Sequence, residues 1–323
     1  MRLEHRPTRP KDLTECLDLS FGHVQPNVRV DLVSLWKKLM ADHCVISSVV
    51  EDRDRPSGRR IVGFGLGLFV TDDFLREAKA DLPPFLALQI LAKWKKGNHA
   101  WFNRQEIARH NAGMGLNLMV VHYRVEHQAT LEAEVPIRYQ MLKALLGLHG
   151  AAGYRFKELA QETLVENDLV LIQQSGMKIR RDYAEWNGLS ALPPDLRPHL
   201  IGITQEESNV IAHSHSIFMS PRPRFAFSPG EKDMLERALE GETDRKIGGS
   251  LKLSVWTVKK RWQSVYGKVE KIEHGFFQGQ ERPGPDPKKE SIEQQRRRIL
   301  LSYLQSHCEE IRPYSPIRAK TSS

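Results

Sequence analysis

Between residues 115 and 183 the sequence alternates between apolar runs and amphipathic helical patterns, and this alternation constrains the fold more than any other feature. Strands are predicted at 1–5, 44–52, 59–70, 115–125, 154–162 and 177–183, and helices at 10–21, 28–40, 134–150 and 164–176. In the helix at 134–150, one buried stripe is expected to hold Ile137, Met141, Leu142, Leu145 and Leu148. This order predicts an α/β domain whose mixed sheet is covered by helices.

The 323-residue chain is long enough for about two domains. Proline-rich segments at 189–200, 220–231 and 278–290 disfavour both helices and central strands. The predicted organisation is therefore a first domain at 1–187, a linker at 188–226, a second domain at 227–277 and a proline-rich segment with an amphipathic helix at 278–323. Within the linker, Thr204 and Glu207 form a capping-box pattern that predicts a short helix.

The positive charge is concentrated at the end of the chain. Residues 221–323 hold 21 Lys and Arg against 14 Asp and Glu, a net charge of +7, whereas residues 1–220 carry +1. A basic segment of this kind is typical of a partner that is a polyanion. No apolar run is long enough to cross a membrane, and the first residues lack a secretory signal, so we expect a cytoplasmic protein without a membrane partner.

Residues 227–277 predict three helices, the last two of which are separated by a tight turn. The first runs from about Gly230 to Leu239, Thr243 begins the second, and Ser254 begins a longer third helix. Two helices joined by a tight turn, the second of them basic, are typical of the helix-turn-helix arrangement.

This segment resembles the LuxR-type helix-turn-helix, through "FSPGEKDML", "ALEGETDRKIGGSLKLS" and "TVKKRWQSVYGKV". It departs from the family at Gly248 and Gly249, where alanine is preferred, at Lys252, where glycine is preferred, and at Lys246, where glutamate is preferred. The two glycines cost about 1 kcal/mol each in helix stability. The resemblance implies an all-α DNA-binding domain in a transcription regulator.

The third helix divides into two faces. Val258, Trp262, Val265 and Val269 follow helical spacing, so Trp262 is expected in the core rather than against a base. On the other face, the resemblance implies that Lys259, Lys260 and Gln263 reach base edges in the major groove. The residues expected to contact or flank the phosphates are Ser254, Trp256, Thr257, Arg261 and Lys268.

A final amphipathic helix is predicted near residues 291–312. Helix-turn-helix proteins usually bind paired half-sites as dimers. This helix is therefore interpreted in two ways, as the contact of a homodimer or as a helix that packs within its own chain.

The first domain resembles the GNAT acyltransferase fold over about residues 1–185, with residues 72–112 unmatched. The resemblance depends on the opening "RLEHRPTRPKDLTECLDLS", the hairpin strand "IVGFGLGLFV", the strand "LMVVHYRV", the helix "RYQMLKALLGLHGAAGYR" and the ending "NDLVLIQQSGMKIRRDY".

Two features on which that family depends for catalysis are missing. The loop that would hold the coenzyme A diphosphate reads "EHQATLEAEVPIRYQML", with no glycine and with Glu126, Glu132 and Glu134. Ile172 stands where the family often has a tyrosine that protonates the departing thiolate. We therefore expect a sensory domain that is not an enzyme and has no cofactor, although acyl-CoA or another small molecule could be its ligand. The alternative is an acyl-CoA-dependent N-acyltransferase with an appended DNA-binding module.

Other motifs predict no further site. His213 and His215 lack a third ligand, and Cys16, Cys44 and Cys308 are far apart, so neither a metal site nor a disulfide is expected. The glycines of "GFGLG", Gly63 to Gly67, lie within a predicted strand and therefore form no nucleotide loop.

Overall fold

The computed structural model describes residues 1–21, 25–128, 130–192, 196–209, 217–278 and 291–315. The chain divides into two compact units. We call residues 1–220 the sheet unit and residues 221–314 the helical unit. The His213–His215 pair lies outside the described residues, and among the described residues no cluster of side chains could hold a metal ion. No helix in the described ranges is long and apolar enough to cross a membrane.

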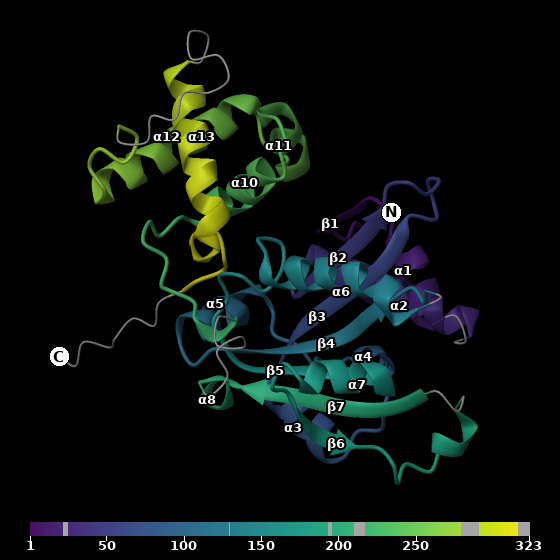
Figure 1. Ribbon diagram of the computed structural model, residues 1–323. Helices are drawn as coiled ribbons and strands as arrows, with labels where there is room; N and C mark the ends of the chain where they lie inside the picture. The colour runs from purple at the N-terminus through teal and green to yellow at the C-terminus, as the bar shows by residue number, and fades with distance from the viewer. Residues whose placement is uncertain (22–24, 129, 193–195, 210–216, 279–290, 316–323) are drawn as a thin grey trace, which may run out of the picture. The chain divides into compact units, whose positions relative to one another are not determined.

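The sheet unit contains one seven-stranded mixed sheet with the order β1-β2-β3-β4-β5-β7-β6 (Figure 1). Its strands are β1 (Leu3–Pro7), β2 (Val45–Asp52), β3 (Ile61–Val70), β4 (Leu116–Val125), β5 (Phe156–Val165), β6 (Lys178–Asp182) and β7 (Leu196–Thr204). Only the β4–β5 pair is parallel, and the other five pairs are antiparallel. The six strands predicted from the sequence are all present, and the predicted mixed sheet is confirmed.

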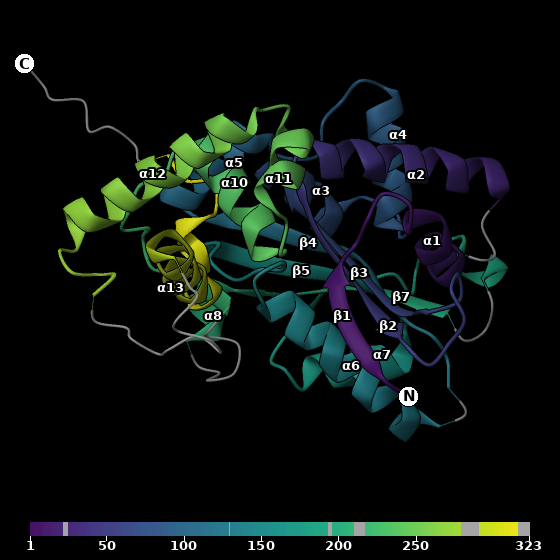
Figure 2. The same cartoon turned by 90° about the horizontal axis from the view of Figure 1, so that it is seen from above.

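Helices cover both faces of this sheet, as Figure 2 shows from above. The helices are α1 (Leu13–Phe21), α2 (Pro26–Ala41), α3 (Asp72–Ala80), α4 (Leu86–Lys95), α5 (Arg104–Ala112), α6 (Leu131–Leu146), α7 (Glu166–Gln173) and the single turn α8 (Gln205–Ser208). Side chains of α1 to α4 pack together with one face of the strands, whereas α5, α6 and α7 contribute to clusters on the other face. The arrangement fits a GNAT-like α/β domain.

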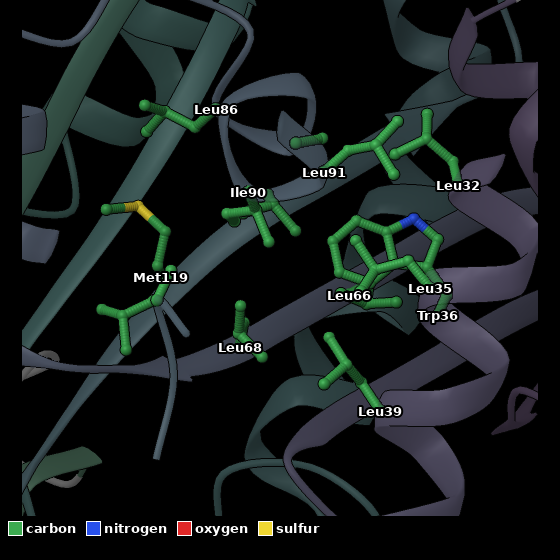
Figure 3. Packing of buried hydrophobic residues seen from close by; sticks show 14 of the residues in the cluster. Leu32, Leu35, Trp36, Leu39, Leu66, Leu68, Leu86, Ile90, Leu91 and Met119 are labelled. Atoms are coloured by element: carbon green, nitrogen blue, oxygen red, sulfur yellow. The ribbon is translucent and has the colours of Figure 1, made fainter. Parts of the chain in front are cut away.

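The main core lies between the sheet and helices α2 and α4 (Figure 3). Trp36, Leu35 and Leu39 of α2 meet the strand residues Leu66 and Leu68 there, and all five are buried. Helix α4, which lies in the stretch unmatched by the family resemblance, supplies a second layer with Leu86, Ile90 and Leu91. The insertion at 72–112 is therefore part of the core.

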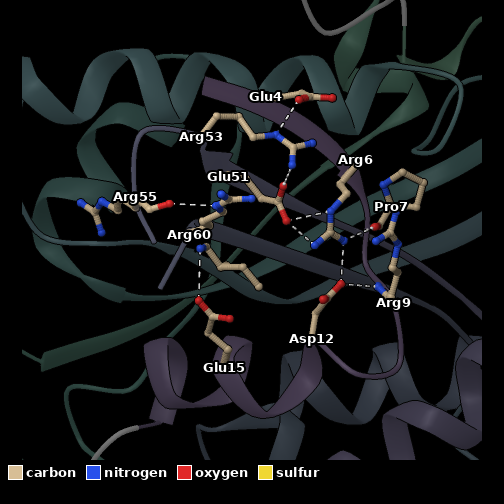
Figure 4. A network of polar contacts seen from close by, with 11 residues as sticks. Glu4, Arg6, Pro7, Arg9, Asp12, Glu15, Glu51, Arg53, Arg55 and Arg60 are labelled. Carbon is tan, nitrogen blue, oxygen red and sulfur yellow. Dashed lines mark hydrogen bonds and ion pairs between the residues drawn. The ribbon is translucent and has the colours of Figure 1, made fainter. Parts of the chain in front are cut away.

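A polar network fixes the β1 edge of the sheet to the start of α1 (Figure 4). The Arg6 guanidinium donates to Glu51 of β2 through Nε at 2.9 Å and to Asp12 through Nη1 at 2.6 Å. Arg53 donates to Glu4 at 2.7 Å. These ion pairs connect β1 and the start of α1 to β2, which lies about 40 residues further along the chain.

The predicted linker at 188–226 needs correction, because part of it belongs to the sheet. Residues 196–204 form β7, which pairs with β5 on one side and β6 on the other. Leu200, Ile201 and Ile203 are buried there. The preceding prolines concealed the strand from sequence analysis, and the predicted short helix is the one turn α8, which has the Thr204–Glu207 capping box.

The helical unit consists of α10 (Pro229–Leu239), α11 (Asp244–Leu251), α12 (Val255–Ile272), α13 (Ile292–Ser306) and a short 3₁₀ turn (Cys308–Glu310). Ser228, Thr243 and Ser254 cap the first three helices. Trp262 is only 1% exposed and lies with Val258, Val265 and Val269, as predicted. Helix α13 packs against α10 within this unit, with Ile299, Leu300 and Leu304 buried. These contacts match the interpretation of the final helix as one that packs within its own chain.

Candidate functional site

Strands β4 and β5 diverge in the middle of the sheet. Their parallel pairing begins at Leu116 and Phe156 and ends with Val120 opposite Gln161. Beyond this point β4 pairs only with β3 and β5 only with β7, although they run on to Val125 and Val165. We call this opening between the two described strands the splay.

A cavity of about 670 Å³ lies on the α6 face of the splay. Its lining comes from β2, β3, β4, β5, α6, the end of α7 and β7. The volume is within the range of small-molecule sites, which are concave and mostly apolar with a few polar groups. We call it the splay cavity.

The glycines of β3 shape this cavity. Gly63, Gly65 and Gly67 alternate along the strand, so all three face α6. A Cβ atom at Gly65 would come within 2.8 Å of the Met141 Cε atom, and one at Gly67 within 2.8 Å of the Leu118 Cδ1 atom. The motif therefore lets α6 approach the sheet and leaves the floor of the cavity open.

Glu162 follows the last β4–β5 pair and points to the opposite face of the sheet from the cavity. Its two carboxylate oxygens accept backbone hydrogen bonds from Phe85 at 2.6 Å and from Leu86 at 2.9 Å, at the start of α4. Phe85 adopts a left-handed conformation with φ of 66°. Burial raises the pKa of Glu162 to about 7, against the lowering effect of those two bonds. The splay therefore holds a carboxyl group that titrates near neutral pH.

Other titratable groups surround Glu162 on the same face. Burial raises the pKa of the Tyr183 phenol, and the Glu162 charge adds to the increase. The Tyr183 hydroxyl has no hydrogen-bond partner among the described residues. Burial also lowers the pKa of Arg124, and it lowers that of His122 to about 3, so this imidazole is neutral at pH 7.

On the cavity side, Tyr123 and Arg138 are among the polar residues of the lining, which also include Ser47, Ser48, Tyr139, His149, Gln161 and Ser175. Arg138 is paired with Glu134 at 2.6 Å and with Asp168 at 2.6 Å. Burial raises the pKa of Tyr123, so its phenol keeps its proton at neutral pH. Among the described lining residues, Arg138 is the only Lys or Arg, and it pairs with two carboxylates.

The start of α6 does not fit a coenzyme A diphosphate. Thr130 caps the helix by accepting from the Ala133 amide, and the Glu134 carboxylate accepts from the Gln128 amide at 3.3 Å. Glu126 is bound to Arg55 at 2.6 Å. To bind the diphosphate, the backbone amides ahead of α6 would have to donate hydrogen bonds to it. Carboxylates of the chain already lie at this place.

The predicted DNA-contacting residues all lie on or at the start of α12. Lys259, Lys260 and Gln263 are exposed together on its outer face. Trp256 is 65% exposed, and the Lys260 ammonium lies 4.3 Å from the centre of its ring.

The residues predicted for phosphate contact have partners within the helical unit. Thr257 and Ser254 bond to each other through their hydroxyls at 2.8 Å. Arg261 donates to the Gly230 carbonyl at 3.0 Å, and Lys268 donates to Glu231 at 2.5 Å. These contacts orient the side chains along α12.

No family model matches the sequence, and no curated protein matches it either. Among solved structures, the chain is similar to the spermidine N-acetyltransferase SpeG of Vibrio cholerae, with 13% identity over 64% of this chain and 95% of that one, at a TM-score of 0.36. A dodecameric form of that enzyme gives 14% identity, coverage of 64% and 95%, and a TM-score of 0.35. The C-terminal condensation domain of Ebony, in complex with beta-alanyl-dopamine, has 13% identity over 63% of this chain and 99% of that one, at a TM-score of 0.35.

These findings correct the expected function. The sequence predicted a transcription regulator whose first domain senses a ligand and is not an enzyme, whereas the solved structures similar to the chain include N-acetyltransferases. The expectation of a regulator that is not an enzyme is therefore wrong, and acyl transfer by this chain is a proposal.

Sequence reasoning missed Glu162, Tyr123 and Tyr183. A signal existed for Glu162, because "FKELAQETLV" places carboxylates inside a strand that is otherwise buried. A charged group in such a strand requires partners and often marks a functional site.

Proposed function

We propose that the sheet unit transfers an acyl group from a thioester to an amine, and that the helical unit is an appended DNA-binding module. The observation that supports the first half is the splay, which has a cavity on one face and the buried carboxyl group of Glu162 on the other. A substrate in the opening between β4 and β5 would be accessible from both faces.

Glu162 would act as the general base. A base whose pKa lies near the working pH is well matched to deprotonate an amine, and a pKa of about 7 meets this condition. As the amine nitrogen bonds to the thioester carbonyl carbon, its proton goes to Glu162. The carbon–sulfur bond then breaks, and the departing thiolate takes the phenol proton of Tyr123.

The experiment is release of free thiol from acyl thioesters in the presence of amines, measured against pH. Activity should rise with pH through about 7, and Glu162→Gln should lower kcat by about 100-fold or more. Glu158→Gln is the matched control, because Glu158 lies on the same face of β5 four residues earlier and pairs with Lys79 at 2.6 Å, within the paired part of the strands. Equal loss in both variants, or no thiol release from any thioester, would refute the proposal.

The DNA-binding half is supported by α11 and α12. Lys252 ends α11 in the left-handed conformation, with φ of 55°, and begins the tight turn into α12. This accounts for the glycine that the LuxR-type family prefers at this position. Lys259, Lys260 and Gln263 form one exposed row that could enter a major groove. That two copies bind paired half-sites as a homodimer stays a prediction.

A further inference from the structure

The outer face of α6 carries an apolar stripe where a surface helix would ordinarily be polar. Val135, Tyr139, Leu142 and Leu146 are spaced by 4, 3 and 4 residues, and between 41% and 56% of each is exposed. All four line the splay cavity. The stripe is therefore an open wall of the cavity rather than a set of scattered surface residues.

The cavity lining is mostly apolar. The stripe runs over twelve residues, 135 to 146, or about 16 Å of helix. Three further aliphatic side chains belong to the lining: Ile172 of α7, Met177 immediately before β6, and Ile203 of β7. The polar residues Tyr123 and Gln161 lie at the splay, where the proposed chemistry would occur. A site for a two-carbon group would need only the region beside the splay.

Among its described residues, the same cavity offers a diphosphate no Lys or Arg without a carboxylate partner. Arg138, the only Lys or Arg among the described lining residues, is already bound to Glu134 and Asp168. The Glu134 carboxylate also occupies the amide of Gln128 ahead of α6. A thioester donor must therefore gain its affinity from a part of the molecule other than a diphosphate.

We propose that the splay cavity binds the thioester donor through an aliphatic acyl chain of about eight carbons or more, laid along α6, and not through a diphosphate. This inference rests on the proposed acyltransferase function, which it deepens by naming the class of donor. The thioester carbonyl lies at the splay beside Tyr123 and Gln161, and the chain runs toward Leu142 and Leu146.

The first test measures binding of acyl-pantetheine thioesters with 2, 4, 8 and 12 acyl carbons to the full chain by calorimetry. Burial of a methylene contributes about 0.8 kcal/mol, which converts to about fourfold in affinity for each carbon that enters the cavity. Octanoyl-CoA and octanoyl-pantetheine should bind within threefold of each other. Affinity that does not change with chain length, or tighter binding of the coenzyme A form by tenfold or more, would overturn the inference.

The second test uses variants that should leave the fold intact, since the substituted side chains are already exposed. Leu142→Glu and Leu146→Glu should each weaken binding of the 12-carbon thioester at least tenfold and leave that of the 2-carbon thioester unchanged. Val170→Glu is the matched control, because Val170 is an exposed aliphatic residue of α7, 49% accessible, that does not line the cavity.

The outcomes separate the inference from the proposed function. Chain-length-dependent binding without thiol release would reject acyl transfer and keep the acyl site. Turnover of acetyl and dodecanoyl thioesters at equal kcat/KM would keep acyl transfer and reject the acyl site. A dimer in light scattering that Leu142→Glu converts to a monomer, with acyl binding unchanged, would show instead that a second copy covers the stripe.

Discussion

Glu162 shows how one residue can have both a structural and a chemical role. Its carboxylate receives the first amides of α4, an arrangement that resembles a cap supplied from another element. Burial nevertheless raises its pKa to about 7, because the low-dielectric interior disfavours the charge. Because the carboxyl group lies at the splay, it is placed to accept a proton from a substrate bound there.

Glu162 also predicts a dependence of stability on pH. Its folded pKa lies above its unfolded value, so its contribution is complete below about pH 4.5 and is lost as pH rises through about 7. The change across this window is on the order of 3 kcal/mol. Urea unfolding from pH 4.5 to 8 should show this loss in the wild type but not in Glu162→Gln. The same slope in both proteins would contradict the assignment.

Trp262 is one of the largest fully buried side chains of the chain and lies in the helical unit. Its indole nitrogen donates to Asp244 at 3.2 Å, and the Arg297 guanidinium lies 4.5 Å from the centre of its ring. Trp262→Ala should lower the free energy of unfolding by about 3 to 5 kcal/mol, because it empties a packed site. Chemical denaturation measures this, with Trp256→Ala as the exposed control, for which we expect a change within about 0.5 kcal/mol.

At the scale of elements, α12 and α6 each show two faces with different roles. On α12 the buried side holds Trp262 and the exposed side holds the row of Lys259, Lys260 and Gln263. On α6, Ile137 and Met141 are buried as predicted, but Leu142 is exposed. The sequence pattern located both helices, yet it placed Leu142 in the wrong environment, because a cavity wall and a core face carry the same apolar residues.

The α12 face predicts which substitutions weaken DNA binding. Lys259→Ala and Lys260→Ala should each cost about 1 to 3 kcal/mol in specific binding without lowering thermal stability. Lys271→Ala, on the last turn of the same helix, is the control for loss of charge alone. Gel-shift titrations at fixed salt measure the effect, and unchanged affinity in both variants would reject the assignment of this face to the major groove.

At the scale of the molecule, the two compact units should respond separately to local damage. Glu310 is fully buried in the helical unit and accepts from the amides of Arg224 at 2.8 Å and Phe225 at 3.0 Å. Glu310→Ala leaves two donors without their acceptor, which costs about 1 to 3 kcal/mol for each.

Hydrogen exchange with mass spectrometry can follow both units in the intact chain. Glu310→Ala should speed exchange in α10 and α13 and leave β4 and β5 unchanged, whereas Glu293→Ala, at an exposed position, should change neither. Faster exchange in β4 as well would show that the units unfold together.

The sequence by itself determined the local elements. Helical spacing separated Trp262 from Trp256, and the hydroxyl residues Thr243 and Ser254 marked where α11 and α12 begin, since these features depend on neighbours within a few residues. Only the tertiary structure decided that β7 enters the sheet between β5 and β6, that β4 and β5 diverge after Val120, and that Glu162 is buried at that point. Strand pairing and burial depend on segments distant in sequence, and no local pattern states which surface will cover which.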